Sequence, residues 1–162
     1  MNPGVLLAIA LLGGAAVTDT EPAALCASRR PGASAEALVL MSVPHPHDTV
    51  VTATVCALLP ARTTATRIGS YHGELYFDST AASVLRVEKL PGGMRVENTT
   101  LAGRVNFAGA APDGFAGGTL LHVTLRVRRP GTTPRVQLKL IELNATNGTS
   151  LMSRLVVNPP RT

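Results

Sequence analysis

Residues 119–128 read TLLHVTLRVR, and apolar and polar side chains alternate through the whole stretch. Successive side chains of a β-strand point to opposite faces, so the alternation predicts a strand with one face in a core and the other in water. The inward set is predicted to be Leu121, Val123, Leu125 and Val127, and the outward set His122, Thr124, Arg126 and Arg128.

Three other stretches show the same split, in residues 68–77, 104–107 and 135–140. Gly73 falls on the inward side of the first of them, which predicts close packing against a neighbour or a bulge at that point. The inward residues are Tyr71, Gly73, Leu75, Phe77, Val105, Phe107, Val136, Leu138 and Leu140, and the outward ones are Ser70, His72, Glu74, Tyr76, Arg104, Asn106, Arg135, Gln137 and Lys139.

Short runs rich in Val, Leu and Thr continue along the chain, separated by clusters of Gly, Pro, Asn and Asp that favour chain reversals. No long helical period provides crossover helices, so the sheets are predicted to be antiparallel. This spacing of strands and turns is typical of an all-β sandwich. The nine predicted strands are residues 37–43, 49–58, 67–77, 84–90, 94–98, 103–108, 119–128, 135–144 and 151–157, with GAAPDGFAGG, residues 109–118, among the turns.

The composition fits one globular domain, with 162 residues, 45% apolar side chains, 15 Gly and 12 Pro. The formal net charge is +5, and 13 of the 15 basic residues are arginine, which is compatible with an acidic partner. Nucleic-acid surfaces usually cluster basic residues among aromatic rings. Here the arginines are dispersed along the sequence among 3 Phe, 2 Tyr and no Trp, so nucleic acid is not the expected partner.

The first sixteen residues, MNPGVLLAIALLGGAA, contain an apolar run followed by small residues, which is the layout of a secretory signal. The run is too short to span a bilayer, so no membrane insertion is expected after cleavage. We predict residues 1–27 as signal peptide or N-terminal tether and residues 28–162 as the domain, in an extracellular or periplasmic location. Cleavage could fall after Ala16 or as late as Ala27.

Two cysteines, Cys26 and Cys56, suit an oxidising compartment. A disulfide between them would tie the N-terminal arm to a strand and contribute about 2–4 kcal/mol to stability. Cleavage after Ala27 would remove Cys26 and leave Cys56 as a lone thiol, so this bridge depends on the cleavage site.

The polar residues of the strand at 67–77 raise the question of catalysis. Ser70, His72 and Glu74 resemble a triad in composition, but residues two apart on one strand stand side by side, about 6.5–7 Å apart, and do not converge on one atom. The segment HPHD, residues 45–48, is predicted to be an exposed turn and not a metal site. No phosphate loop or calcium loop is present, so we expect neither an enzyme nor a cofactor.

Four segments, taken in order, resemble the cohesin family of secreted nine-stranded sandwiches with jelly-roll topology. HDTVVTATV, residues 47–55, is similar to the family's Gly-Asp-Thr-Val element, with His47 in place of the glycine. LYFDSTAASVLRVEKL, residues 75–90, has the family's aromatic residue and aspartate before a Val-Leu pair, with Ser79 where proline is usual. The other two segments are GRVNFAGAAPDGFAGGTLLHVTLRVR, residues 103–128, and VQLKLIELNATNGTSL, residues 136–151.

The resemblance implies a non-catalytic module, because the best-known members bind dockerin modules through one face of the sandwich. That face would correspond here to the strands predicted at residues 67–77, 103–108, 119–128 and 135–144. The partner would be another protein, either dockerin-like or a protein of the envelope. The predicted partner-binding residues are Ser70, His72, Glu74, Arg104, Asn106, His122, Thr124, Arg126, Gln137 and Lys139.

Two other functions stay open. The wider superfamily includes bacterial carbohydrate-binding modules, so a module that binds polysaccharide during its breakdown is the first alternative. Such modules stack aromatic rings on sugars, and this chain offers only Tyr71 and Tyr76 besides three Phe that are predicted to be mostly buried. The second alternative is a structural domain of the envelope whose outward arginines keep it soluble. The Ala, Arg and Gly bias is typical of a GC-rich bacterial genome, in which the sequons at Asn98, Asn144 and Asn147 would be inert.

Overall fold

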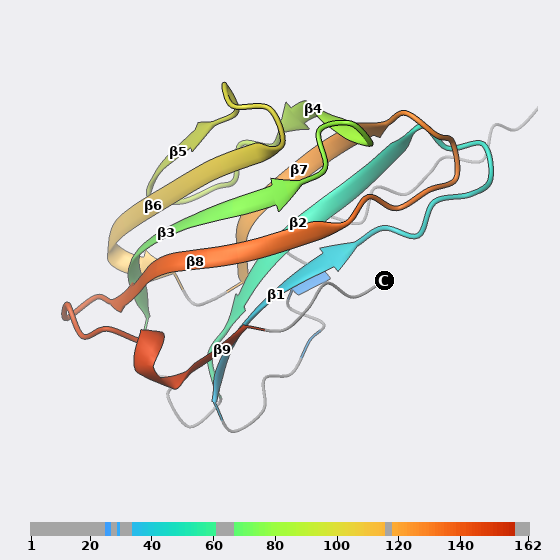
Figure 1. The fold of residues 1–162 in the computed structure, drawn as a ribbon. Coiled ribbons are helices and arrows are strands. Elements are labelled where there is room, and N and C mark those ends of the chain that lie inside the picture. Colours follow the sequence, from blue (N-terminus) through green and yellow to red (C-terminus); the bar gives the residue numbers. More distant parts are fainter. Residues whose placement is uncertain (1–24, 27–28, 30–33, 61–66, 116–117, 158–162) are drawn as a thin grey trace, which may run out of the picture.

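The computed structural model describes residues 25–26, 29, 34–60, 67–115 and 118–157. These residues form nine strands and one short 3-10 turn, η2 (Met152–Arg154), as Figure 1 shows. Within them, no helix has the length and hydropathy needed to cross a bilayer. The strands are β1 (Ala35–Met41), β2 (Val50–Leu58), β3 (Ile68–Phe77), β4 (Ala82–Val87), β5 (Met94–Asn98), β6 (Arg104–Phe115), β7 (Gly118–Val127), β8 (Val136–Ala145) and β9 (Leu155–Val157).

The strands form two sheets that pack face to face. Sheet A has the order β4-β7-β2-β1-β9, and sheet B has the order β5-β6-β3-β8. Because most connections cross from one sheet to the other, the prediction of a nine-stranded jelly-roll sandwich is confirmed. The pairing of β9 with β1 is parallel, so the prediction of purely antiparallel sheets is wrong there. The chain reaches β9 from the opposite sheet through η2, and such a crossing does not fix strand direction as a hairpin does.

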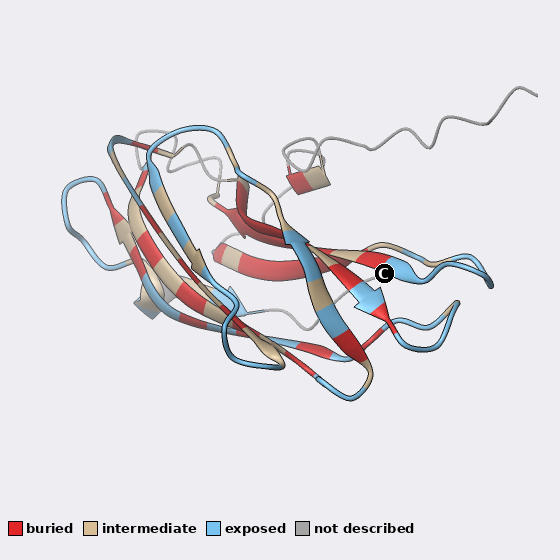
Figure 2. Cartoon of the chain, turned by 90° about the horizontal axis from the view of Figure 1, so that it is seen from above, coloured by how far each residue is buried: buried red, intermediate tan, exposed pale blue. Residues whose placement is uncertain are grey.

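The core lies between the sheets and draws buried residues from both, and Figure 2 shows these buried residues along the strands. Leu75, Phe107 and Leu125 point inward as the alternation predicted, and each is at most 2% exposed. The close packing around Gly73 explains why this position in the strand interior is a glycine. A Cβ there would lie 2.5 Å from Cζ of Phe107, and the register with β8 also shifts between His72 and Gly73. Both features predicted for Gly73, the close neighbour and the bulge, are therefore present.

Strand β6 is longer than predicted, because it continues through the segment taken as a turn. Ser70 pairs with Ala110, whereas Ile68 pairs with Phe115, so four residues of β6 face the single residue between them on β3. Gly114 has a φ of 68°, and its carbonyl accepts two hydrogen bonds from the Arg67 guanidinium, at 3.2 and 2.8 Å. The Gly and Pro residues thus produce a bulge inside a strand instead of a chain reversal.

The N-terminal segment contributes to the folded domain where it is described. Cys26 and Cys56 form a disulfide with an S–S distance of 2.06 Å. Cys26 is 0% exposed and packs with Leu25, Leu38 and Leu40 on the outer side of sheet A. At least Leu25 and Cys26 are therefore part of the packed structure and not a free tether. The apolar run of the predicted signal peptide, Val5–Leu12, lies outside the described residues.

Candidate functional site

The outer face of sheet B brings together most of the predicted partner-binding residues. The central strand β3 has β6 on one side and β8 on the other, so polar side chains form rows across three strands. Glu74 is the middle of one row, opposite Asn106 on β6 and Lys139 on β8. Seven of the ten predicted residues lie on this face: Ser70, His72, Glu74, Arg104, Asn106, Gln137 and Lys139.

Glu74 is the centre of a charged cluster on this face. Its Oε1 lies 3.3 Å from Nη1 of Arg104, its Oε2 lies 3.6 Å from Nζ of Lys139, and the Tyr76 hydroxyl donates a hydrogen bond to Oε2. The hydrogen bond from Tyr76 and, after it, the charges of Lys139 and Arg104 hold the pKa of Glu74 below its ordinary value of 4.5. The carboxylate is therefore ionised at neutral pH, and two cations around one anion leave this cluster with a net positive charge.

A second polar cluster lies towards the other end of β3. The Ser70 hydroxyl donates to Oε1 of Glu142 at 2.7 Å, and Nδ2 of Asn144 donates to the same oxygen at 2.8 Å. Within the described residues, no Lys or Arg forms an ion pair with Glu142, so this cluster is negative. His72 lies between the two clusters in the sheet, half-buried and opposite Ala108 and Glu142. The face thus has a positive end, a negative end and an imidazole between them.

The edge strand β5 adds an apolar strip that sequence analysis missed. Met94 is 73% exposed and Val96 is 59% exposed, and they pair with Ala110 and Ala108 of β6. The alternation of β5 is inverted, because Arg95 and Glu97 take the more buried positions between them. Arg95 explains the inversion, since its Nη1 donates to the Tyr71 hydroxyl at 2.7 Å and to the Thr119 carbonyl at 3.2 Å. The alternation of charged and apolar residues in this short strand does not show which of the two sets faces inward, so the exposure of Met94 and Val96 was not predicted.

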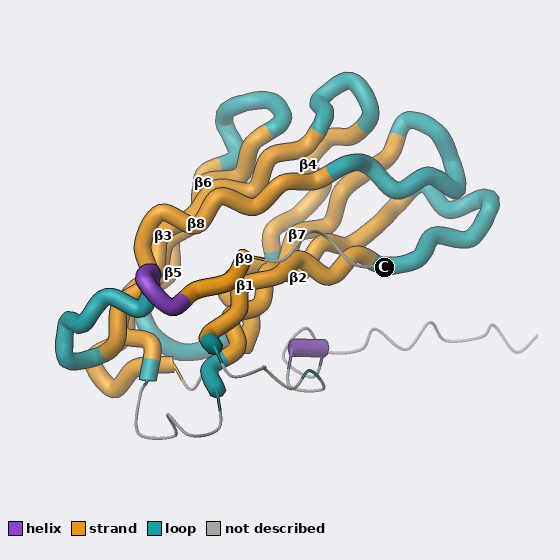
Figure 3. Tube along the Cα trace, turned by 60° about the horizontal axis from the view of Figure 1, so that its bottom comes forward, coloured by secondary structure: helices purple, strands orange, loops and turns teal. Residues whose placement is uncertain are grey.

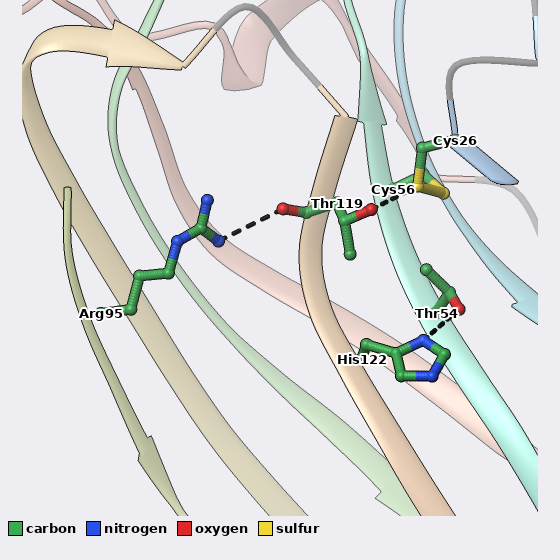
Figure 4. Close-up of a disulfide and its surroundings, with 6 residues drawn as sticks. All are labelled: Cys26, Thr54, Cys56, Arg95, Thr119 and His122. Atoms are coloured by element: carbon green, nitrogen blue, oxygen red, sulfur yellow. Dashed lines mark hydrogen bonds between the residues drawn. A yellow bond between two sulfur atoms is a disulfide. The ribbon is translucent and has the colours of Figure 1, made fainter. Parts of the chain in front are cut away.

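Three predicted residues, His122, Thr124 and Arg126, lie on β7 in sheet A, so the single ten-residue face is wrong in this part. Strand β7 pairs with β2 and β4, and its outward side faces away from sheet B. His122 is only 7% exposed, and its Nδ1 lies 2.7 Å from Oγ1 of Thr54. Figure 4 shows this pair near the Cys26–Cys56 disulfide, where the Thr119 hydroxyl also contacts Sγ of Cys26 at 3.2 Å. Alternation defines two faces of a strand but does not say which sheet the strand joins.

The geometry also bears on catalysis, metal binding and sugar binding. Ser70 donates its hydrogen bond to Glu142 on another strand, whereas Glu74 accepts from Tyr76, so neither is paired with His72. Among the described residues, no group of three His, Cys, Asp or Glu could hold a metal ion. Tyr71 is 2% exposed, and burial raises its pKa, so it is not a platform for a sugar ring.

No protein-family model matches the chain, and no curated protein matches it in sequence. Solved structures do match its fold. A chain of a type I cohesin–dockerin complex from Clostridium thermocellum has a TM-score of 0.59 at 17% identity, covering 82% of this chain and 96% of that chain. A non-cellulosomal cohesin from the archaeon Archaeoglobus fulgidus has a TM-score of 0.60 at 17% identity, covering 79% and 88%. The cohesin module of a Clostridium perfringens family 33 glycoside hydrolase has a TM-score of 0.53 at 13% identity, covering 72% and 87%.

These matches define the class of fold. The chain is a jelly-roll sandwich with the fold of cohesin modules, as the four sequence segments indicated.

Proposed function

We propose that this chain is a non-catalytic recognition domain that binds another protein through the outer face of sheet B. The observation that carries the proposal is that this face combines two preformed polar clusters with an exposed apolar strip. Protein interfaces combine apolar anchors with polar groups already held in place, because fixed side chains lose little entropy on binding. Met94 and Val96 supply the anchors, and the Glu74 cluster supplies the held polar groups.

Two further observations support this face. Among the described side chains, the buried polar atoms without a hydrogen-bond partner are Nε of Arg104 and Oδ1 of Asn106, and both belong to residues of this face. Both atoms are covered by the protein itself, so a bound partner could complete these hydrogen bonds only if the two side chains turned outward, which would remove the cost of leaving them unpaired. The similar Clostridium thermocellum structure is a cohesin–dockerin complex, so a dockerin-like module is the first partner to test.

The proposed location is outside the cytoplasm. A disulfide persists in oxidising compartments, and this one requires Cys26 in the mature chain. Signal cleavage after Ala16 keeps Cys26, whereas cleavage after Ala27 removes it, so we propose the earlier site. N-terminal sequencing of the secreted protein is the direct measurement, and a mature chain that begins after residue 26 would contradict the proposal.

The experiment is a binding measurement with matched surface variants. The protein captures partners from the secreted proteins of its source, and each captured candidate is then purified and titrated against the domain. His72→Glu and Val96→Glu place a charge on the outer face of sheet B and should each weaken binding at least about tenfold. Ser83→Glu is the matched control, because Ser83 is exposed and pairs with Arg126 on the outer side of sheet A.

Equal loss of affinity in all three variants, or no loss in His72→Glu and Val96→Glu, would exclude the proposed face. Affinity electrophoresis in soluble cellulose, xylan and chitin derivatives tests the sugar-binding alternative. Retardation by one of these polymers, abolished by Tyr76→Ala, would replace protein recognition with sugar recognition.

A further inference from the structure

Two loops at one end of the sandwich are held against each other, as Figures 1 and 3 show. They are the β1–β2 loop, residues 42–49, and the β7–β8 loop, residues 128–135. The Gly131 N–H donates to the Asp48 carbonyl at 2.9 Å, and the Val127 N–H donates to the Thr49 carbonyl at 2.9 Å. Gly131 has a φ of 71°, and a Cβ there would lie 2.8 Å from the Pro46 carbonyl oxygen. The tip formed by these loops is therefore fixed before any ligand arrives.

Four exposed arginines lie at this tip, and all four fall within residues 126–135, RVRRPGTTPR. Their guanidinium groups have no hydrogen bond or ion pair to any described residue. In contrast, four other described arginines bond to backbone carbonyls, to a hydroxyl or to glutamates, whereas Arg29, which lies outside these loops, has no such bond. We name the two loops and the four arginines the arginine end; its arginines are Arg126, Arg128, Arg129 and Arg135. The arginines with bonded guanidinium groups are Arg67, Arg86, Arg95 and Arg104.

The arginine end holds more than half of the net charge of the chain. Its four arginines and Asp48 give +3, out of +5 for all 162 residues. The Asp48 carboxylate accepts the His45 N–H at 2.7 Å, so it is bonded inside its own loop. Asp78 in the adjoining β3–β4 turn lowers the local charge to +2, and its carboxylate accepts from Thr80 at 2.8 and 2.6 Å. Neither carboxylate forms a hydrogen bond or ion pair with the four arginines, which stay available to an external anion.

The positions of these arginines indicate what kind of surface could bind them. Strand β7 belongs to sheet A and β8 to sheet B, so the loop between them carries arginines across the ends of both layers. A surface that meets the sandwich end-on could therefore contact arginines from both layers. Val43 is 70% exposed and Val50 is 39% exposed at the same end, which adds apolar contact area. A projecting tip of arginines and apolar side chains fits an extended, flat, anionic surface.

We propose that the arginine end docks on the headgroups of an anionic membrane. Each arginine near such a surface gains electrostatic free energy, and exposed valines can enter the interface between headgroups and acyl chains. The tip lacks the large aromatic rings that stack best on bases or sugars, because residues 42–49 and 126–135 contain no Phe, Tyr or Trp and offer only the imidazoles of His45 and His47. Docking at this end leaves the outer face of sheet B exposed at the side of the sandwich, so the inference does not depend on the proposed function.

The test is sedimentation of the purified protein, with its disulfide formed, in the presence of lipid vesicles. We expect binding to vesicles that contain phosphatidylglycerol, no binding to pure phosphatidylcholine vesicles, and weaker binding as salt is added. Arg128→Gln should lower the affinity about fivefold and the double variant with Arg129→Gln about 25-fold. Arg86→Gln is the matched control and should bind as the wild type does, because Arg86 on β4 is exposed but paired with Glu88, which follows that strand.

Three outcomes would overturn the inference: unchanged vesicle binding in Arg128→Gln/Arg129→Gln, an equal loss in Arg86→Gln, or binding to polyglutamate without binding to anionic vesicles. The last outcome would assign the arginine end to an acidic protein segment. His72→Glu should bind vesicles as the wild type does, which separates this test from that of the sheet B face. Thermal unfolding of each variant shows whether a loss of binding reflects a loss of folding.

Discussion

The outer faces of the two sheets differ although both consist of strands with alternating side chains. The outer side of sheet A is partly closed, because Leu38, Leu40 and Cys56 are at most 8% exposed and pack with Cys26 of the N-terminal segment. The outer side of sheet B is open, and its two largest apolar side chains on β5, Met94 and Val96, are more than half exposed. A face covered by its own chain contributes to stability, whereas an open face with fixed polar clusters is suited to an external partner.

One matched pair of substitutions tests this comparison directly. Leu40→Ser and Val96→Ser each place a hydroxyl on an outward position, one in each sheet. We expect Leu40→Ser to lower the free energy of unfolding by about 2–5 kcal/mol, because Leu40 is buried. Val96→Ser should stay within about 0.5 kcal/mol of the wild type. Urea unfolding followed by circular dichroism gives both values, and similar losses in the two variants would mean that the faces do not differ in this way.

Removal of the disulfide tests what closes sheet A. The double variant Cys26→Ala/Cys56→Ala should lose about 2–4 kcal/mol, since the bridge restricts the unfolded chain between residues 30 apart in sequence. Wild-type protein treated with a reductant should show the same loss and should bind a dye specific for apolar surface. The comparison of the sheets would need revision if partner binding to sheet B fell as well while the variant remained folded.

Arg95 connects the two sheets and provides a third test. It lies on the sheet B edge strand, donates to the Thr119 carbonyl of sheet A at 3.2 Å, and stacks 4.5 Å from the centroid of the Phe115 ring. Arg95→Leu should cost about 1–3 kcal/mol, because the buried carbonyl and hydroxyl partners lose a donor. Arg95→Lys should restore part of this, whereas Arg86→Gln should have little effect because its ion pair is exposed. Equal unfolding midpoints for Arg95→Leu and Arg86→Gln would contradict the role of Arg95.

Glu74 gives the smallest expected effect, and it depends on pH. The pKa of Glu74 is lowered in the folded chain, so its ionised form adds stability above the ordinary value of 4.5, and this is lost as pH falls through the folded-state pKa. The wild type should therefore exceed Glu74→Gln in stability at pH 7, and the difference should vanish at strongly acidic pH. Tyr76→Phe should reproduce part of the difference, because its hydroxyl is the largest cause of the lowered pKa. A difference that does not change with pH would show that Glu74 acts through packing alone.

Much of the candidate site could be predicted from the sequence because alternation is a local property. Ser70, His72 and Glu74 had to share a face, whatever the strand pairs with. The exposure of Met94 and Val96 could not be predicted, because it depends on Arg95 reaching Tyr71 and Thr119 on other strands. Glu142 and Asn144 were missed as well, although they lie at the end of a predicted strand, because their role depends on pairing with Ser70.

The sequence by itself determined most of the strands, the two sides of those with clear alternation and the order of segments typical of cohesin modules, since these depend on neighbouring residues and turn formers. Only the tertiary structure decided that β7 joins sheet A, that His122 is buried against Thr54, and that the β7–β8 loop with its arginines is held against the β1–β2 loop. The reason is that pairing between distant strands and the crossing of loops from one sheet to the other are set by the packing of the whole core, which no local pattern encodes.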